Sequence, residues 1–154
     1  MAGVHTNKME KKIYYLIGQP GSGKTTLAKY LCEHILGNVH HIDGDDLRNL
    51  TQNKDYSENG RRANVELAQT MARLSFNDGK NVVMSIVSPF KDLRDKFKDE
   101  FKDDVIEIFV HTTDIRGREH FHVENYQIPT ENYIDIDTTN KSISQSVALI
   151  VSSC

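Results

Sequence analysis

The 154-residue sequence contains few of the residues that mark secreted or membrane proteins. It has two cysteines, Cys32 and Cys154, which are too few for a disulfide framework and fit a reducing compartment. No apolar run approaches the roughly 20 residues that a membrane-spanning helix needs. Residues 1–12 are polar and lack the apolar stretch of a secretion signal. We therefore expect a cytoplasmic protein with no membrane partner, in which residues 1–12 form a flexible tail.

The sequence also lacks an excess of positive charge. Nineteen lysines and arginines stand against 22 aspartates and glutamates, which gives a formal net charge of −3. This balance argues against a basic field for nucleic acid or for an anionic membrane. The hydrophobic share of 38% and the chain length are typical of one globular domain. A small anionic substrate would have to be attracted by local charge.

Strand-like and helix-like segments alternate from residue 13 onwards. The expected strands are apolar runs at residues 13–17, 39–42, 81–87, 105–110 and 133–136. The expected helices lie at residues 25–36, 58–77, 90–102 and 142–151. Residues 112–132 show no period and predict a lid. The alternation predicts an α/β fold of three layers, with a parallel sheet covered by helices on both faces, as a single domain at residues 13–154.

A phosphate-binding motif lies between the first expected strand and the first expected helix. Residues 18–25 match G-x-x-x-x-G-K-[ST]. The glycines let backbone N–H groups surround an anion, and the start of the helix adds positive potential. Lys24 would reach the β- and γ-phosphates of ATP, and Thr25 would bind Mg²⁺. The expected nucleotide contacts are Gly18, Gly21, Ser22, Gly23, Lys24, Thr25 and Thr26.

The rest of the sequence lacks the motifs of other classes of nucleotide-binding protein. A GTPase needs Asn-Lys-x-Asp after a later strand, and the nearest sequence, at residues 53–55, has the wrong spacing. A motor or transport ATPase favours a strand that ends in two acidic residues, whereas residues 81–87 lead into Ser88 and Pro89. A short chain with a late lid favours a kinase that acts on a small molecule.

Two aspartates flank Gly44 directly after the second expected strand. In parallel sheets, ligands bind at the carboxyl ends of the strands, so the candidate site comprises residues 18–25, 43–48, 85–89 and the segment after His111. A turn accounts for Gly44 and for one of the two aspartates. A second aspartate beside a phosphate cradle indicates a catalytic or magnesium-binding role. Phosphoryl transfer needs a group that orients the attacking hydroxyl and accepts its proton. We assign this role to Asp45, and the holding of magnesium through water to Asp43; Lys24, Asp43 and Asp45 are the expected catalytic residues.

These motifs resemble the adenylylsulfate (APS) kinases, which phosphorylate the ribose 3′-hydroxyl of adenosine 5′-phosphosulfate. The resemblance extends from residue 13 to about residue 151. It rests on the phosphate cradle with Lys24-Thr25-Thr26, on Asp43-Gly44-Asp45-Asp46-Leu47-Arg48, on Tyr56-Ser57 with Arg61 and Asn64, and on Val87-Ser88-Pro89-Phe90.

The resemblance implies a set of acceptor contacts. Tyr56 stands where the family has a phenylalanine that stacks on the substrate base, and Arg61 and Asn64 match residues that hold the substrate. Arg116 stands where the family lid begins with a lysine. The implied substrate-binding residues are Asp45, Arg48, Tyr56, Arg61, Asn64, Val87, Ser88 and Arg116. Family members are often dimers, so a homodimer is also implied.

The sequence departs from the family pattern on the substrate side. Glu66 and Leu67 replace two arginines, and the lid at residues 116–127 is shorter than the family's. Within the cradle, residues 19–22 are Gln-Pro-Gly-Ser in place of Leu-Ser-Gly-Ala. The acceptor therefore stays open between adenylylsulfate and a cytidine diphosphate conjugate, such as the cytidine diphosphoramidate of bacterial capsule modification. Two alternative functions are those of another small-molecule kinase and of a nucleotide-binding module without catalysis.

Some polar residues have ordinary structural interpretations. His40 and His41 point to opposite sides of a strand, so they are poorly placed to chelate one metal. The charged residues 91–102 predict a solvated helix face. Arg48 and Arg61 would be surface charges in most helices, but their positions after residues 43–45 and at a helix start favour anion binding. Arg116 and Arg118 are expected to close on the transferred phosphate.

Overall fold

The computed structural model describes residues 10–114 and 116–154. Residues 1–9 of the expected tail lie outside the described residues. Its last two residues are attached to the fold: the Lys11 ammonium donates a hydrogen bond to the Phe76 carbonyl, and the Lys12 N–H donates to the Asn81 side chain. The flexible tail therefore does not reach as far as residue 12.

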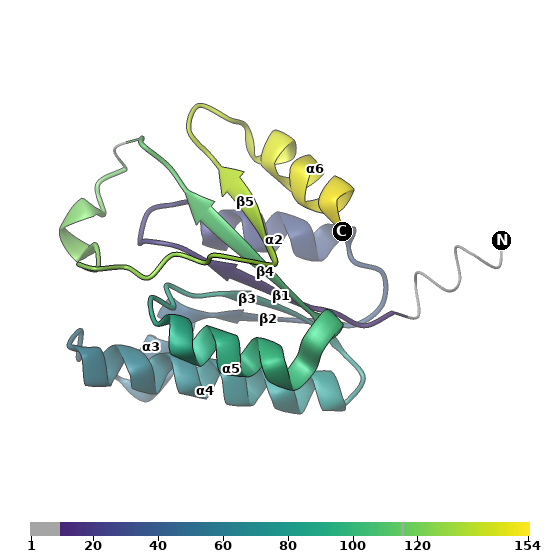
Figure 1. The fold of residues 1–154 in the computed structure, drawn as a ribbon, viewed down its shortest axis with the longest axis horizontal. Helices are drawn as coiled ribbons and strands as arrows, with labels where there is room; N and C mark the ends of the chain where they lie inside the picture. Colours follow the sequence, from purple (N-terminus) through teal and green to yellow (C-terminus); the bar gives the residue numbers. More distant parts are fainter. Residues whose placement is uncertain (1–9, 115) are drawn as a thin grey trace, which may run out of the picture.

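Five parallel strands form one sheet in the order β2-β3-β1-β4-β5 (Figure 1). β1 lies at the centre, where Ile13 pairs with Val82 on one side and with Val105 on the other. Their bounds are β1 Ile13–Ile17, β2 Val39–Asp43, β3 Asn81–Ser85, β4 Val105–His111 and β5 Tyr133–Asp137. The parallel sheet expected from the apolar runs is confirmed.

Helices cover both faces of the sheet (Figure 1). One face carries α2 (Lys24–His34) and α6 (Ile143–Ser153), and the other carries α4 (Glu58–Asn77) and α5 (Lys91–Phe101). Alternate residues of β1 serve the two cores: Tyr15 packs on the α4 side and Leu16 on the α2 side. Because both faces of the sheet are buried at its centre, β1, β3 and β4 are mostly apolar, whereas the edge strands β2 and β5 carry more polar residues.

One helix was not expected from the sequence. α3 (Gly44–Thr51) begins directly after β2, where the sequence predicted only a turn. Asp43 caps it, because its carboxylate accepts hydrogen bonds from the N–H groups of Asp45 and Asp46. Eight residues are too few to show a clear helical period, so the cap was the only available sequence signal.

The prediction of a solvated face along residues 91–102 was wrong at Arg94. Arg94 is fully buried on α5, and its guanidinium bonds to Glu107 of β4 at 2.8 Å. Lys98 reaches the second carboxylate oxygen of Glu107 at 2.6 Å. A buried charge requires such partners. Arg94 also donates to the carbonyls of Ser88 and Gln127, so it ties the segment after β3 to the end of the lid.

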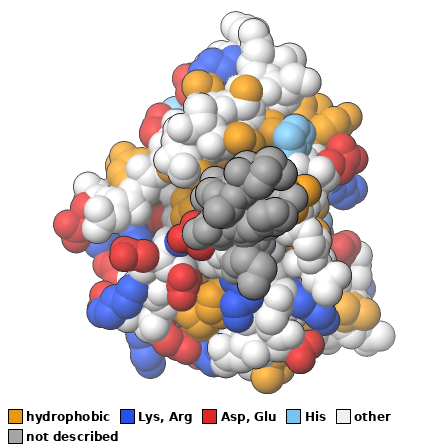
Figure 2. All heavy atoms as spheres, turned by 90° about the vertical axis from the view of Figure 1, so that its right-hand side faces the viewer, with side chains coloured by type: hydrophobic (Ala, Val, Ile, Leu, Met, Phe, Trp, Pro, Cys, Tyr) orange, Lys and Arg blue, Asp and Glu red, His pale blue; other side chains and the backbone are white. Residues whose placement is uncertain are grey.

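The remaining segments agree with the expected surface character. Residues 112–132 contain one short 3-10 helix, Glu119–Phe121, in the part that the structure describes. Acidic and basic side chains are interspersed on the face shown in Figure 2. No helix within the described ranges is long and apolar enough to cross a bilayer.

Candidate active site

A pocket of about 500 Å³ lies at the carboxyl ends of the strands, between the cradle, α3, α4 and the lid. It brings together most of the residues that the sequence singled out. On its wall are Gly21, Gly23, Lys24, Thr25, Thr26, Asp45, Asp43, Arg48, Tyr56, Arg61, Asn64, Val87, Ser88 and Arg116. Gly18 and Ser22 are the two candidates that are not on this wall; the Ser22 side chain is buried behind it.

The cradle depends on glycine at its turns. Gly21 and Gly23 adopt φ angles of 84° and 102°, which side chains other than hydrogen rarely tolerate. Gly23 is also the N-cap of α2, so the cradle leads directly into the positive end of that helix. The buried Ser22 hydroxyl oxygen has no hydrogen-bond partner in the described structure. The shape and the free polar groups fit a triphosphate.

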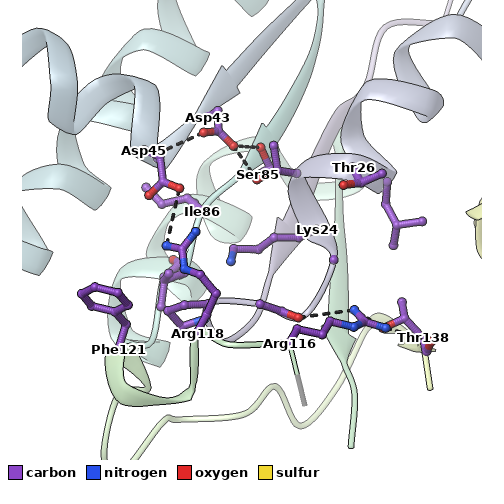
Figure 3. Close-up of a pocket in the computed structure, with 18 of the residues that line it drawn as sticks. Lys24, Thr26, Asp43, Asp45, Ser85, Ile86, Arg116, Arg118, Phe121 and Thr138 are labelled. Atoms are coloured by element: carbon purple, nitrogen blue, oxygen red, sulfur yellow. Dashed lines mark hydrogen bonds and ion pairs between the residues drawn. The ribbon is translucent and has the colours of Figure 1, made fainter. Parts of the chain in front are cut away.

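Lys24 extends into the pocket from the first residue of α2 (Figure 3). It is buried, and its ammonium donates to the Gln19 carbonyl at 3.2 Å. Desolvation lowers the pKa of Lys24 to about 8, and the nearby carboxylates of Asp45 and Asp43 offset only part of this effect. A buried ammonium group whose desolvation is only partly offset by carboxylates is suited to binding an anionic ligand.

Asp43 is the most heavily bonded acid of the pocket. Its Oδ1 accepts hydrogen bonds from the hydroxyls of Thr25 at 2.8 Å and Ser85 at 2.7 Å. Its Oδ2 accepts from the N–H groups of Asp45 and Asp46 at 3.2 and 3.4 Å. Four donors occupy the lone pairs of the carboxylate. Asp43 is therefore fixed in place, and it holds Thr25, the residue that the motif assigns to magnesium.

Asp45 is more exposed than Asp43 and its side chain makes fewer contacts. It lies in the first turn of α3 and its side chain is 65% exposed. Its nearest charged partner is Arg118 of the lid, at 3.8 Å (Figure 3). An exposed carboxylate at the mouth of the pocket, opposite Lys24, is available to a hydroxyl of an incoming molecule.

The far half of the pocket is aromatic and cationic. Tyr56 is half exposed, and the Arg48 guanidinium lies 4.1 Å from the centre of its ring. Arg61 lies 5.5 Å from the same ring, and the Phe121 ring of the lid lies 6.1 Å away. Arg48 also donates to oxygens of Asn53 and Asp55, so it shapes the preceding loop. This half presents flat apolar surface beside positive charge.

The other predicted acceptor contacts are less open. Asn64 is buried, its amide N–H donates to the Gly44 carbonyl, and its Oδ1 has no partner among the described residues. The Val87 carbonyl accepts from the Tyr126 hydroxyl, and the Ser88 carbonyl accepts from Arg94. Asn64 thus retains an acceptor for a ligand, whereas these two carbonyls are already bonded.

Arg116 lies on the nucleotide side and not beside the aromatic half. Its guanidinium donates to the Ser22 and Gly21 carbonyls at 3.0 and 3.3 Å, and it contacts Thr138 (Figure 3). The family resemblance placed Arg116 among the acceptor contacts, and the sequence also predicted that it closes on the transferred phosphate. The course of the lid brings it onto the cradle, which agrees with the second expectation better than with the first.

Two further polar residues at strand ends join the site, and only Thr138 lies outside the segments expected from the sequence. Ser85 bonds to Asp43, and the Thr138 hydroxyl donates to the Ser22 carbonyl at 2.8 Å. Ser85 ends β3, and Thr138 directly follows β5. The rule that ligands bind at the carboxyl ends of parallel strands placed Ser85 in the candidate segment 85–89, and applied to the fifth strand it would also have pointed to Thr138.

Comparison with protein families identifies the family of the chain that carries this pocket. The family model described as adenylylsulphate kinase matches residues 10–123. The chain belongs to the adenylylsulphate kinase family. The resemblance drawn from the motifs is thereby confirmed, and with it the expectation of a P-loop kinase.

Curated relatives are adenylyl-sulfate kinases at modest identity. That of Burkholderia ambifaria is 35% identical over 108 residues, which cover 66% of this chain and 60% of the relative. That of Oceanobacillus iheyensis is 26% identical, over 96% of this chain and 85% of the relative. The matched region thus spans less than two thirds of the Burkholderia enzyme.

Solved structures share the fold. The Mycobacterium tuberculosis APS kinase CysC in complex with AMPPNP and APS has a TM-score of 0.75 at 21% identity, covering 93% of this chain and 96% of that one. A gluconokinase from Sinorhizobium meliloti has a TM-score of 0.71 at 17% identity, covering 94% and 91%. These neighbours confirm the predicted kinase-type α/β fold.

Proposed function

We propose that this protein is an ATP-dependent kinase that phosphorylates the ribose 3′-hydroxyl of a nucleoside 5′-phosphate conjugate, with adenylylsulfate as the first candidate. The observation that carries the proposal is the placement of Asp45 between two different halves of one pocket. On one side lies the phosphate cradle with buried Lys24, and on the other lie Tyr56 and two arginines.

In the nucleotide half, Gly21, Gly23 and Lys24 would hold the phosphates of ATP. Mg²⁺, when bound, would supply positive charge to the phosphate oxygens. Thr25 would hold it, and Asp43 would act through Thr25 and through metal-bound water, because four donors already engage its carboxylate. Lys24 would neutralise charge that develops on the transferred group. Support for ATP comes from the family and from the AMPPNP bound to the M. tuberculosis relative.

In the acceptor half, Tyr56 would stack on the base, and Arg48 and Arg61 would attract the phosphate or sulfate oxygens. Asn64 would accept a hydrogen bond at its free Oδ1. Asp45 would orient the 3′-hydroxyl and accept its proton. The new O–P bond would form to the γ-phosphorus of ATP as its bond to the leaving ADP breaks.

A cytidine diphosphate conjugate is the second candidate acceptor. It is suggested by Glu66 and Leu67, which replace two arginines of the family pattern. Within the described structure, however, neither residue is on the pocket wall, and Leu67 packs against the core. The loss of these charges therefore changes the pocket less than the sequence suggested, which supports adenylylsulfate as the first choice.

A coupled assay of ADP release tests the proposal. The acceptors are adenylylsulfate, a cytidine diphosphate conjugate and unconjugated nucleosides, and mass spectrometry locates the added phosphate. We expect release that depends on one nucleotide conjugate and a product phosphorylated at the 3′ position. ADP release without an acceptor would indicate an ATPase, and absence of any transfer despite ATP binding would indicate a module without catalysis.

The assembly and location of the protein remain predictions. We propose a homodimer, as the family resemblance implies; the hexameric APS kinase from Thiobacillus denitrificans makes a larger assembly the alternative. Light scattering on the purified protein would measure its mass directly. Fluorescence microscopy of a tagged chain would test the expected cytoplasmic location.

A further inference from the structure

A chain of hydrogen bonds leads from the edge of the sheet to the phosphate cradle. His41 and Asp43 are two residues apart on β2 and so share a face of the strand. Asp43 is in register with Ser85 on β3. The His41 Nε2 lies 2.7 Å from the Ser85 hydroxyl, which lies 2.7 Å from Asp43 Oδ1. Thr25 meets the same oxygen at 2.8 Å.

The direction of each hydrogen bond follows from the chemistry of the groups. An ionised carboxylate can only accept, so the single Ser85 proton points to Asp43. The Ser85 oxygen must then accept from His41, and therefore Nε2 of His41 carries a proton. Ser85 is 1% exposed, so water cannot readily replace the histidine as its donor. The neighbouring His40 bonds to Ser75 instead, on the other side of the strand.

We propose that His41 is a positioning residue, whose Nε2–H fixes the Ser85 hydroxyl and thereby holds the Asp43 carboxylate against Thr25. Its consequence for catalysis rests on the proposed function, because Thr25 is assigned to magnesium there. Without the His41 donor, the Ser85 hydroxyl is free to rotate away from Asp43, and the carboxylate loses one of the two hydroxyl contacts that fix Oδ1. Metal-site residues that orient the ligands of a metal typically change metal affinity or activity by roughly 10- to 100-fold when removed.

The first test examines wild-type protein without metal or nucleotide. Nitrogen-15 NMR of the histidine rings at pH 8 distinguishes a proton on Nε2 from a proton on Nδ1. We expect His41 with the proton on Nε2, assigned by loss of its signal in His41→Gln. A proton on Nδ1 alone would overturn the proposal whatever reaction the protein catalyses.

The second test uses four single variants and one double variant, each checked by thermal melting. His41→Leu removes the donor, and His41→Gln keeps an amide N–H at the end of a side chain of similar reach. Ser85→Ala removes the middle of the hydrogen-bond chain. His40→Leu is the matched control, because it removes the adjacent histidine from the opposite side of β2.

The readouts are magnesium-dependent binding of a fluorescent ATP analogue and the magnesium dependence of turnover. We expect His41→Leu to raise the magnesium concentration for half-maximal binding by roughly tenfold, and His41→Gln and His40→Leu to stay within about threefold of wild type. In the Ser85→Ala background, His41→Leu should add no further effect. Additive effects, or equal effects of His41→Leu and His40→Leu, would overturn the proposal. Because binding needs no acceptor, an unsuccessful search for the acceptor leaves this test intact.

Discussion

The two halves of the pocket are built on different principles. In the nucleotide half, Lys24 and Asp43 are 7% and 6% exposed, and backbone groups and hydroxyls fix them. In the acceptor half, Tyr56 is 50% exposed and is surrounded by long arginine side chains. The first half is fixed by protein contacts alone, and we propose that the second half is completed by the acceptor. Substitutions in the two halves should therefore affect different steps.

Asp45→Asn acts where the two halves meet and should have the largest effect. The amide cannot accept the hydroxyl proton, so kcat should fall by roughly a hundredfold to ten-thousandfold. Affinity for the ATP analogue should change little. The free energy of unfolding should change by less than about 1 kcal/mol, because an exposed charge in a first helical turn contributes about that much.

The control for this variant is Asp46→Asn, which changes the next exposed acid in the same turn of α3. It should turn over like the wild type. If Asp45→Asn also turns over at the wild-type rate, Asp43 is left as the acid that assists transfer, and the division between a fixed and a free carboxylate is wrong.

Lys24→Ala tests the nucleotide half. Loss of a buried positive charge beside the transferred group should lower kcat by roughly a hundredfold to a thousandfold. Lys29→Ala, an exposed lysine on the same helix, is the control. Steady-state kinetics with saturating acceptor measures both, and a Lys24→Ala rate within about tenfold of wild type contradicts the assigned role of the cradle.

Tyr56→Ala tests the acceptor half. Stacking of a base on an aromatic ring contributes roughly 1–3 kcal/mol, so the KM for the acceptor should rise about fivefold to a hundredfold. The KM for ATP should stay the same. Tyr56→Phe should behave like the wild type, and Tyr30→Ala serves as a control for loss of an exposed tyrosine outside the pocket. Equal changes in both KM values would assign Tyr56 to packing.

The smallest expected effect is the uptake of a proton when nucleotide binds. Because the pKa of Lys24 is lowered to about 8, much of this lysine is neutral at pH 8.5 in the free protein. The triphosphate favours the charged form and raises the pKa, so binding should take up roughly half a proton to one proton at pH 8.5. Below pH 7 the free lysine is already charged and the uptake should vanish.

Isothermal titration calorimetry in two buffers with different ionisation enthalpies measures this uptake. Lys24→Met should abolish it at pH 8.5. Uptake that persists in Lys24→Met would mean that another group titrates, and constant uptake between pH 6.5 and 8.5 would contradict the lowered pKa.

The fold was largely predictable because most of its strands are local apolar runs with glycine or polar residues after them. β1 and α4 were predicted at their observed bounds. α3 was missed because it is short and follows β2 without a linker. Arg94 was misjudged because its partner Glu107 lies on another element, and a single glutamate in an apolar strand does not reveal where its partner is.

The candidate site divides in the same way. The cradle is one contiguous motif, so its residues could be read from the sequence directly. Ser85 and Thr138 are single polar residues, and their contacts depend on how separate strand ends meet. The position of Arg116 depends on the path of the lid, and the lid sequence has no apolar periodicity from which that path could be predicted. Local chemistry was predictable, and contacts between distant segments required the structure.

The central position of β1 has a consequence for how this chain is made. Among the five strands of the sheet β1 is synthesised first, yet both of its neighbours, β3 and β4, come much later. The hydrogen-bonded residues Lys12 and Asn81, which lie next to the starts of β1 and β3, are 69 positions apart. At about 5–20 residues per second, roughly 3 to 14 seconds of translation separate the strand from its first partner. During this interval the apolar segment Ile13–Ile17 has no sheet to join. We therefore expect Ile13–Ile17 to be open to chaperone binding until β3 has been made, whereas β4 and β5 can pair with a sheet that already exists.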